Sequence, residues 1–207
     1  MTEDLFETSA HAYPEAIDIG LDGGALSYYR HFYSRSEADC LFKSLLCDIE
    51  WQQEYIQMYG VERPIPRLSA WYGDPNISYS YSGIAAKPKN WTPLLQNIKI
   101  LVEQRTGEIF NGVLVNRYRN GQDSVSWHSD DESSLGPDPI IASLSFGQSR
   151  YFQLKHKRKE GEKYQLELEH GSLLLMKSGV QKNWLHQAPK TRREVAERIN
   201  LTFRRIM

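Results

Sequence analysis

The sequence predicts a mainly β protein with flanking helices, in which a double-stranded β-helix (jelly roll) core is braced by N-terminal helices. Helical periodicity is confined to two segments in the first half of the 207-residue chain, and after Gly107 it gives way to short β-type segments. Many short strands with turn signals and no helices between them favour a sandwich or barrel, and the jelly roll is one such fold.

The first helix is expected near residues 35–50. Ser34 followed by Glu37 resembles a capping box, in which each side chain satisfies a backbone N–H at the start of a helix. Apolar residues then recur at helical spacing, at Leu41, Phe42, Leu45, Leu46 and Ile49. Residues 1–20 show little periodicity and are expected to be loosely ordered.

Residues 51–90 are rich in aromatic side chains and are interrupted by Pro64, Pro66 and Pro75. This composition predicts loops and hairpins. The aromatic residues either pack against the outer face of a sheet or provide surfaces on which nucleic-acid bases stack.

The second helix is expected to follow Thr92, with Pro93 at its first position, and to end at Gly107. Threonine is a favourable N-cap, proline is tolerated at the first helical position, and glycine is common just beyond a helix end. Strands separated by glycine-containing turns are then expected near residues 112–119, 140–146, 150–155, 163–168, 172–176 and 198–204.

Charge is unevenly distributed along the chain. The net charge is −1, which by itself argues against a nucleic-acid binder. Residues 1–50, however, hold ten acidic and three basic residues, whereas residues 51–207 hold 16 acidic and 22 basic residues. An acidic front and a basic body permit a basic surface on one side of the molecule.

The cysteine spacing and the lack of a signal-peptide pattern favour a reducing, cytoplasmic compartment. Cys40 and Cys47 lie about two helical turns apart, which is unfavourable for a disulfide. No basic N-terminal segment precedes an apolar run, so a signal peptide is not expected, and the longest apolar run, Leu173 to Met176, is too short to span a bilayer. We expect a monomer that is neither secreted nor bound to a membrane.

A histidine and a carboxylate two residues apart, His128 and Asp130, form a candidate metal site. Alternate residues of an extended segment point to the same side, and His186 lies downstream near another predicted strand. Two histidines and one carboxylate are the facial triad of non-haem iron(II) oxygenases, which leaves positions open for dioxygen and a cosubstrate. The match alone is weak, because Asp131 and Glu132 follow and an acidic, solvated loop is the plain alternative.

The C-terminal segment alternates strictly between polar and apolar residues. Arg198, Asn200, Thr202 and Arg204 share one face, which on an ordinary strand would lie in water. A dicarboxylate, however, needs two cationic anchors, and guanidinium groups pair with carboxylates bidentately. The two arginines lie roughly 20 Å apart by strand rise, so they would serve opposite ends of a small molecule.

Asn116 and Tyr118 form another alternating pair, on the strand that precedes the His-x-Asp segment. Both side chains can donate hydrogen bonds to a carboxylate inside a barrel. On an edge strand the same pair would have no special role.

Six segments resemble the AlkB dioxygenases in order and spacing, most closely the branch that contains the human nuclear DNA-repair enzymes. They are Asn116-Arg117-Tyr118, His128-Ser129-Asp130-Asp131-Glu132, Ser143-Leu144-Ser145-Phe146-Gly147, His170-Gly171-Ser172-Leu173, Trp184-Leu185-His186 and the Arg-x-Asn-x-Thr-x-Arg pattern of residues 198–204. The resemblance covers residues 50–207 well and residues 20–50 loosely.

The resemblance implies a role for each matching residue. The catalytic iron(II) ligands would be His128, Asp130 and His186. The residues that hold 2-oxoglutarate would be Asn116, Tyr118, Arg198, Asn200, Thr202 and Arg204. Asp131 would face the methylated base.

Two further segments match parts of the family that contact the substrate. Met58, Tyr59 and Gly60 match a hydrophobic finger that fills the gap left by a flipped base, with Tyr59 as its tip. Tyr79, Ser80 and Tyr81 match a hairpin that walls the base pocket. The family often has phenylalanine in place of Tyr81, so the preferred lesion is left open.

The resemblance also implies an order of regions. Residues 1–50 would be an N-terminal extension with a bracing helix, residues 51–108 a nucleotide-recognition region, and residues 109–207 the jelly-roll core.

The implied activity is oxidative demethylation of N-alkylated DNA bases such as N1-methyladenine and N3-methylcytosine. Fe(II), 2-oxoglutarate and O2 would be required, and formaldehyde, succinate and CO2 released. The chain would act in the nucleus of a eukaryote, or in the cytoplasm or nucleoid of a bacterium. The alternatives are the same chemistry on methylated RNA or another substrate, and a non-enzymic jelly-roll module with a structural metal. Structural zinc normally has four protein ligands, and only three are evident.

Overall fold

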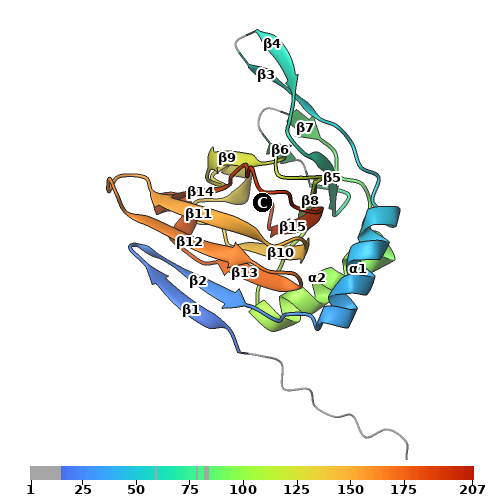
Figure 1. The fold of residues 1–207 in the computed structure, drawn as a ribbon, viewed down its shortest axis with the longest axis horizontal. Coiled ribbons are helices and arrows are strands. Elements are labelled where there is room, and N and C mark those ends of the chain that lie inside the picture. The colour runs from blue at the N-terminus through green and yellow to red at the C-terminus, as the bar shows by residue number, and fades with distance from the viewer. Residues whose placement is uncertain (1–14, 59, 78, 82–83) are drawn as a thin grey trace, which may run out of the picture.

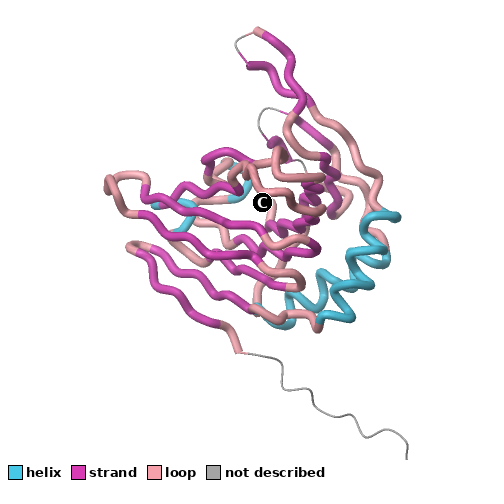
Figure 2. The backbone as a smooth tube through the Cα atoms, viewed as in Figure 1, coloured by secondary structure: helices cyan, strands magenta, loops and turns pink. Residues whose placement is uncertain are grey.

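The structure is a computed structural model, and it describes residues 15–58, 60–77, 79–81 and 84–207. Antiparallel strands dominate it, and the two long helices lie together on one side of them (Figures 1 and 2). The predicted fold class, mainly β with flanking helices, is therefore confirmed.

Two sheets form the body of the molecule. The larger sheet has the strand order β1-β2-β13-β10-β15-β8-β5. In that order the strands are Ile17–Leu21, Gly24–Tyr29, Ser172–Met176, Ile141–Gly147, Arg198–Arg204, Gly112–Tyr118 and Leu68–Gly73. The smaller sheet has the order β12-β11-β14-β9, formed by Lys163–Leu168, Arg150–His156, Trp184–Ala188 and Val125–His128.

Two hairpins are separate from these sheets. Strands β3 (Tyr55–Met58) and β4 (Val61–Pro64) form a hairpin that projects from the body (Figure 1). Strands β6 (Tyr79–Tyr81) and β7 (Ile84–Ala86) form the second. The remaining short elements are the 3-10 helix η1 (Ser133–Leu135) and the single-turn helix α3 (Val180–Asn183).

Both long helices begin where the sequence predicts; the second also ends there, whereas the first ends two residues before the predicted end. Helix α1 spans Arg35–Asp48, and Ser34 and Glu37 form both hydrogen bonds of the capping box. Helix α2 spans Pro93–Thr106, with Thr92 accepting a hydrogen bond from the N–H of Leu95. Gly107 ends α2 in a left-handed conformation with φ of 74°, which favours glycine because it has no Cβ.

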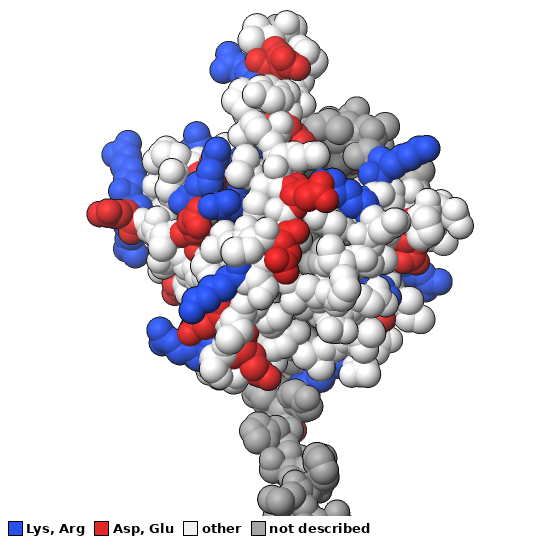
Figure 3. All heavy atoms as spheres, turned by 90° about the vertical axis from the view of Figure 1, so that its right-hand side faces the viewer, with Lys and Arg blue, Asp and Glu red and all other residues white. Residues whose placement is uncertain are grey.

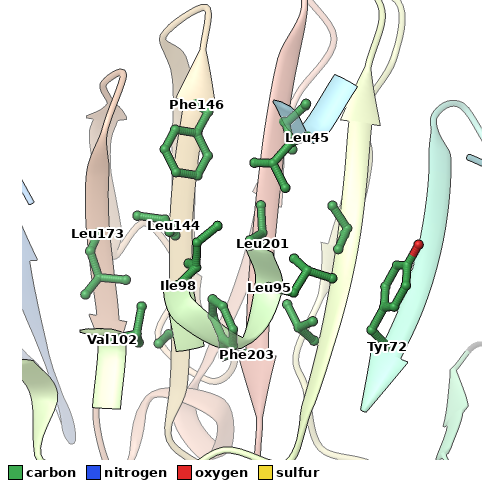
Figure 4. Close-up of a cluster of buried hydrophobic side chains, with 14 of the residues drawn as sticks. Leu45, Tyr72, Leu95, Ile98, Val102, Leu144, Phe146, Leu173, Leu201 and Phe203 are labelled. Atoms are coloured by element: carbon green, nitrogen blue, oxygen red, sulfur yellow. The ribbon is translucent and has the colours of Figure 1, made fainter. Parts of the chain in front are cut away.

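The main hydrophobic core lies between the helices and the larger sheet. Leu45 of α1 and Leu95, Ile98 and Val102 of α2 are at most 1% exposed. Figure 4 shows these side chains packed against residues of β5, β10, β13 and β15, namely Tyr72, Leu144, Phe146, Leu173, Leu201 and Phe203. This packing fixes one face of the sheet, and the opposite face is left for the cavity described below.

Two expectations for the first half of the chain are corrected. The sequence predicts that residues 17–20 are loose, yet they belong to β1, which pairs along its whole length with β2. It predicts loops and hairpins for residues 51–90, yet β5 is a strand of the larger sheet, paired with β8. Trp71 and Tyr72 of β5 are buried inside the molecule.

The face that carries the two long helices shows no concentration of one charge. On the side of the molecule shown in Figure 3, the basic and acidic side chains of the described residues are interspersed, and the projecting β3–β4 hairpin carries both signs. The basic surface that the charge distribution permits is therefore not on this side.

Candidate active site

The nine residues predicted to hold a metal or 2-oxoglutarate all line one cavity. Strands β8 and β15 of the larger sheet contribute Asn116, Tyr118, Arg198, Asn200, Thr202 and Arg204. Strands β9 and β14 of the smaller sheet contribute His128 and His186, which are register partners. Asp130 lies just after β9. The cavity therefore lies between the two sheets.

The predicted alternation of β15 determines which of its residues reach the cavity. Its polar residues line the cavity, whereas Ile199, Leu201 and Phe203 belong to the main core. All seven residues of β15 are buried. The alternative of an ordinary strand with its polar face in water is therefore excluded.

His128, Asp130 and His186 come together as the sequence predicts. Each offers one ligand atom, and these atoms lie within 4.8 Å of one another. His186 Nε2 lies 3.9 Å from Asp130 Oδ2. His128 Nδ1 lies 2.8 Å from the carbonyl oxygen of Ser126, so Nδ1 carries the proton and the lone pair of Nε2 is left for a metal.

The charge states of these groups suit a divalent cation. Burial lowers the pKa of His186 to about 3, so its imidazole is neutral near pH 7. Burial alone would raise the pKa of Asp130, but the positive charge of Arg204 outweighs this effect and the pKa is lowered to about 2. Two imidazoles and a buried carboxylate are the donor set that iron(II) oxygenases use.

An observation on buried polar atoms tests whether a metal fits here. Among the described residues, Asp130 Oδ2 and His186 Nδ1 are buried without a hydrogen-bond partner. An unpaired carboxylate oxygen in a buried site costs free energy unless a cation compensates it. The donor set and the unpaired oxygen both fit a bound Fe(II), with His128, Asp130 and His186 as its ligands.

Two contacts that the sequence does not predict hold Asp130 in place. Arg204 Nη2 donates to Asp130 Oδ1 at 2.8 Å, so Arg204 contacts the metal-binding end of the cavity. The backbone N–H of Asp130 donates to Gln181 Oε1 at 3.0 Å, and Gln181 is 1% exposed. Gln181 lies on α3, and a spacing of 51 residues gives no sequence signal for this contact.

Arg198 marks the other end of the polar row on β15. Its guanidinium donates to Ser145 Oγ at 3.0 Å and lies over the ring of Tyr118, 5.1 Å from the centroid. Arg150 lies over the same ring at 6.0 Å. Arg198 Nε is buried without a partner among the described residues, as expected for an arginine that pairs with a ligand carboxylate.

Arg67 is a further cavity residue that the sequence does not reveal. It is 5% exposed, and its Nε donates to Asn116 Oδ1 at 2.9 Å. Its Nη1 donates to the carbonyl oxygen of Ser124 at 3.2 Å. Pairing of β5 with β8 brings Arg67 to this position, and the sequence gives no signal for β5.

Asp131 does not line the cavity that contains Asp130. Its carboxylate accepts hydrogen bonds from Ser129 Oγ at 2.7 Å and from Lys157 Nζ at 3.2 Å. It lines a neighbouring hollow of about 530 Å³ together with Lys157. The role implied for Asp131 at the methylated base remains a prediction.

The predicted finger and pocket wall coincide with the two separate hairpins. Met58 ends β3, and Gly60 lies just before β4 with φ of 77°. Tyr59 lies outside the described residues. Tyr79, Ser80 and Tyr81 form β6. The roles of these residues in substrate binding remain predictions.

A second group of potential metal ligands lies in the described part of the chain, at Asp22, His156 and Glu162. Two of its members are already engaged. His156 Nδ1 accepts the N–H groups of Arg158 and Lys159 at 3.1 and 3.0 Å, and Lys159 Nζ pairs with Asp22. A neutral histidine that accepts at one ring nitrogen carries its proton on the other, so this group is better explained as a hydrogen-bonded turn.

Comparisons with known proteins agree with this geometry. Residues 25–204 match the model of the 2OG-Fe(II) oxygenase superfamily. Alpha-ketoglutarate-dependent dioxygenase alkB homolog 3 of Homo sapiens is 42% identical over 187 residues, which cover 86% of this chain and 65% of that protein. DNA oxidative demethylase ALKBH2 of Homo sapiens is 38% identical over 189 residues, covering 86% of this chain and 72% of that protein.

The chain spans 63–65% of the length of the alkB homolog 3 proteins from four mammals. Solved structures show the same fold at lower identity. OsALKBH1 has a TM-score of 0.58 at 16% identity, covering 91% of this chain and all of that one. A prolyl hydroxylase from Trichoplax adhaerens has a TM-score of 0.57 at 13% identity, covering 87% and 83%.

None of the helices in the described residues is long and apolar enough to cross a membrane. The matched superfamily model spans most of the chain, and the relatives named for AlkB are about 40% identical to it. The chain therefore belongs to the 2OG-Fe(II) oxygenase superfamily and, within it, to the AlkB family.

Proposed function

We propose that this protein removes methyl groups from the ring nitrogens of alkylated DNA bases by oxidising them, with Fe(II), 2-oxoglutarate and O2. One observation carries the proposal: a metal-binding trio, of which Asp130 and His186 are buried and Asp130 Oδ2 is unpaired, shares a cavity with Arg198 and Arg204. The printed name of one relative, DNA oxidative demethylase, supports DNA as the substrate.

His128, Asp130 and His186 would hold Fe(II), and the bound ion would supply the position at which O2 is activated while 2-oxoglutarate is oxidised. Arg204 Nη2 donates to Oδ1 of Asp130, and Gln181 Oε1 accepts the backbone N–H of Asp130. Both contacts fix the direction of the remaining carboxylate oxygen. Fe(II) bound to these three side chains would have ligand positions left for the cosubstrate and O2.

The cosubstrate would lie along the polar row of β15. Arg198 at one end would pair with the distal carboxylate of 2-oxoglutarate, with Tyr118 beside it. Asn116 would add an amide donor, because its Oδ1 is already engaged by Arg67. Asn200 and Thr202 hold each other through the hydrogen bond from Thr202 Oγ1 to Asn200 Oδ1, at 3.0 Å, and complete the wall.

The reaction inserts one oxygen atom of O2 into a C–H bond of the N-methyl group, and the second oxygen atom enters succinate as CO2 leaves. The resulting N-hydroxymethyl base loses formaldehyde and regains its unmethylated form. Atoms within a stacked duplex cannot reach a buried cavity, so the base must be flipped out. The finger with Tyr59 and the hairpin with Tyr79, Ser80 and Tyr81 would then contact the duplex and the flipped base.

We further propose that the protein acts as a monomer where genomic DNA is, in the nucleus of a eukaryote or the nucleoid of a bacterium. Alkylated DNA is the partner that this proposal requires.

The proposal is tested by measuring formaldehyde release from oligonucleotides that carry N1-methyladenine or N3-methylcytosine. DNA and RNA, each single- and double-stranded, are compared with and without Fe(II) and 2-oxoglutarate. We expect release from DNA that requires both additions. Release from RNA alone would favour the alternative substrate, and absence of both formaldehyde and succinate would refute the proposed chemistry.

A further inference from the structure

The Asp131 carboxylate already has a cationic partner before any base is bound. Lys157 Nζ lies 3.2 Å from Asp131 Oδ2, and the side chain of Lys157 is 25% exposed. Ser129 Oγ donates to the same carboxylate oxygen at 2.7 Å. A positively charged base that approaches Asp131 must therefore share the carboxylate with Lys157 or displace it.

Lys157 is held in this position by more than the ion pair. Its Nζ also donates to the carbonyl oxygen of Gln181 at 2.8 Å, and its backbone N–H donates to the carbonyl oxygen of Asn183 at 2.7 Å. Gln181 in turn binds the backbone of Asp130. Lys157 is thus anchored to the segment that supports a metal ligand, which is unusual for a residue of an exposed basic run.

The neighbouring lysine of the same run has a different environment. Lys159 pairs with Asp22 on the β1–β2 turn, and its side chain is 59% exposed. Lys159 therefore contributes a similar charge from the same turn without contacting Asp131. The two residues provide a matched pair for separating a local effect on Asp131 from general attraction of nucleic acid.

Asp130 and Asp131 are consecutive residues that line two different spaces. Asp130 lines the metal cavity, and Asp131 lines the hollow that it shares with Lys157, Gln181 and Lys182. Asp131 follows the metal ligand Asp130 directly in the chain, and Gln181 contacts both the backbone of Asp130 and the Lys157 ammonium group, so the ion pair lies near the metal-binding residues. A base whose methyl group reaches the metal would therefore lie within range of the charges on Asp131 and Lys157.

We propose that Lys157 determines how strongly the site discriminates between positively charged and neutral alkylated bases, by competing with the base for Asp131. This inference rests on the proposed demethylase function. With a neutral base in the cavity, Lys157 compensates the charge of Asp131. With a cationic base, Lys157 weakens the attraction that Asp131 would otherwise exert. Lys157 thereby broadens the range of bases that the site accepts.

The test compares two pyrimidine lesions of nearly the same shape. N3-methylcytosine carries a positive charge and N3-methylthymine is neutral, and both are placed in the same single-stranded oligonucleotide. For Lys157→Met we expect the ratio of kcat/KM for the cationic lesion over the neutral lesion to rise about three- to fivefold, because exposed ion pairs contribute modest energies. Lys157→Arg keeps the charge and should keep the ratio within about twofold of the original value.

Two controls decide what any change means. Lys159→Met should lower kcat/KM for both lesions by the same factor, as loss of general phosphate attraction does. In the Asp131→Asn background, Lys157→Met should leave the ratio of kcat/KM values unchanged, because the carboxylate for which Lys157 and the base compete has been removed. An equal effect of Lys157→Met on both lesions, or a change in the ratio that persists in the Asp131→Asn background, would overturn the proposal.

Binding without turnover separates this inference from the proposed function. The Kd of each oligonucleotide is measured without O2, with Mn²⁺ and 2-oxoglutarate present, for the original protein and Lys157→Met. A shift of about threefold or more in the ratio of Kd values toward the cationic lesion supports the role of Lys157. An unchanged ratio refutes it, whether or not the protein releases formaldehyde.

Discussion

At the scale of single residues, the metal ligands differ in what else they support. Asp130 is 1% exposed and pairs with Arg204, which is 2% exposed, whereas His128 is only half-buried. Loss of Asp130 would leave a buried guanidinium without its carboxylate, and loss of His128 would not. Both ligands are expected to be needed for metal binding, whereas only Asp130 is expected to contribute to folding through Arg204.

We predict that Asp130→Ala and His128→Ala both abolish demethylation, and that Asp130→Ala alone lowers the free energy of unfolding, by about 3–5 kcal/mol. Urea unfolding of the metal-free proteins measures the second effect, and Mn²⁺ titration measures loss of the metal site. Equal stability of the two variants would mean that Arg204 finds another partner. Retained activity in either variant would refute the metal assignment.

Arg67 is predicted to be a positioning residue for the cosubstrate. It engages Asn116 Oδ1 and so directs the amide nitrogen of Asn116 toward a ligand carboxylate. We expect Arg67→Met to raise the KM for 2-oxoglutarate about tenfold, because a hydrogen bond that involves a charged group is removed. The kcat at saturating 2-oxoglutarate should change much less.

The matched control for this prediction is Arg63→Met, since Arg63 is exposed on the projecting β4 strand. Steady-state succinate formation at varied 2-oxoglutarate measures both constants. A fall in kcat with KM unchanged would show that Arg67 does not act through the cosubstrate.

At the scale of elements, β15 joins the core to the site. Phe203 is fully buried in the main core, between helix α2 and the sheet. Phe203→Ala is predicted to destabilise the protein by about 3–5 kcal/mol, because a large cavity replaces the ring. Ile109→Ala, at a side chain that is 66% exposed, should change stability by less than about 0.5 kcal/mol. Thermal and urea unfolding measure both.

Elements whose signals are local could be predicted from the sequence. The caps of α1 and α2 depend on residues within one turn, such as Ser34, Glu37 and Gly107. Strand β5 could not be predicted, because five of its six residues are buried and it lacks the alternation of a half-exposed strand. Strand β1 could not be predicted either, because its residues are mostly exposed and it is defined by pairing with β2.

At the scale of the whole molecule, local motifs predict some residues of the site, whereas others depend on contacts that form only in the folded chain. The metal ligands and the polar row of β15 can be predicted because their spacing is characteristic. The roles of Arg67, Gln181 and Lys157 cannot, because each acts through a partner that the chain fold brings close. Such contacts follow from strand order and helix placement, which no short motif records.

The projecting β3–β4 hairpin belongs to this scale, since it extends beyond the body that contains the cavity (Figure 1). If the tip inserts into DNA, Tyr59→Ala should reduce demethylation of a lesion in duplex DNA at least about tenfold more than in a single strand. Rates with the same lesion in both contexts measure the difference. Equal losses in the two contexts would remove the wedge role.

The burial of β15 on both faces also limits how this protein can vary. Adding or deleting one residue within 198–204 would exchange the two faces of the strand beyond that point. Apolar side chains would then face the ligands, and arginine side chains would point into the hydrophobic core. A substitution changes one side chain of this strand, whereas a change in length displaces every residue that follows it. Homologues should therefore accumulate insertions in the turns that flank this strand and keep its length constant.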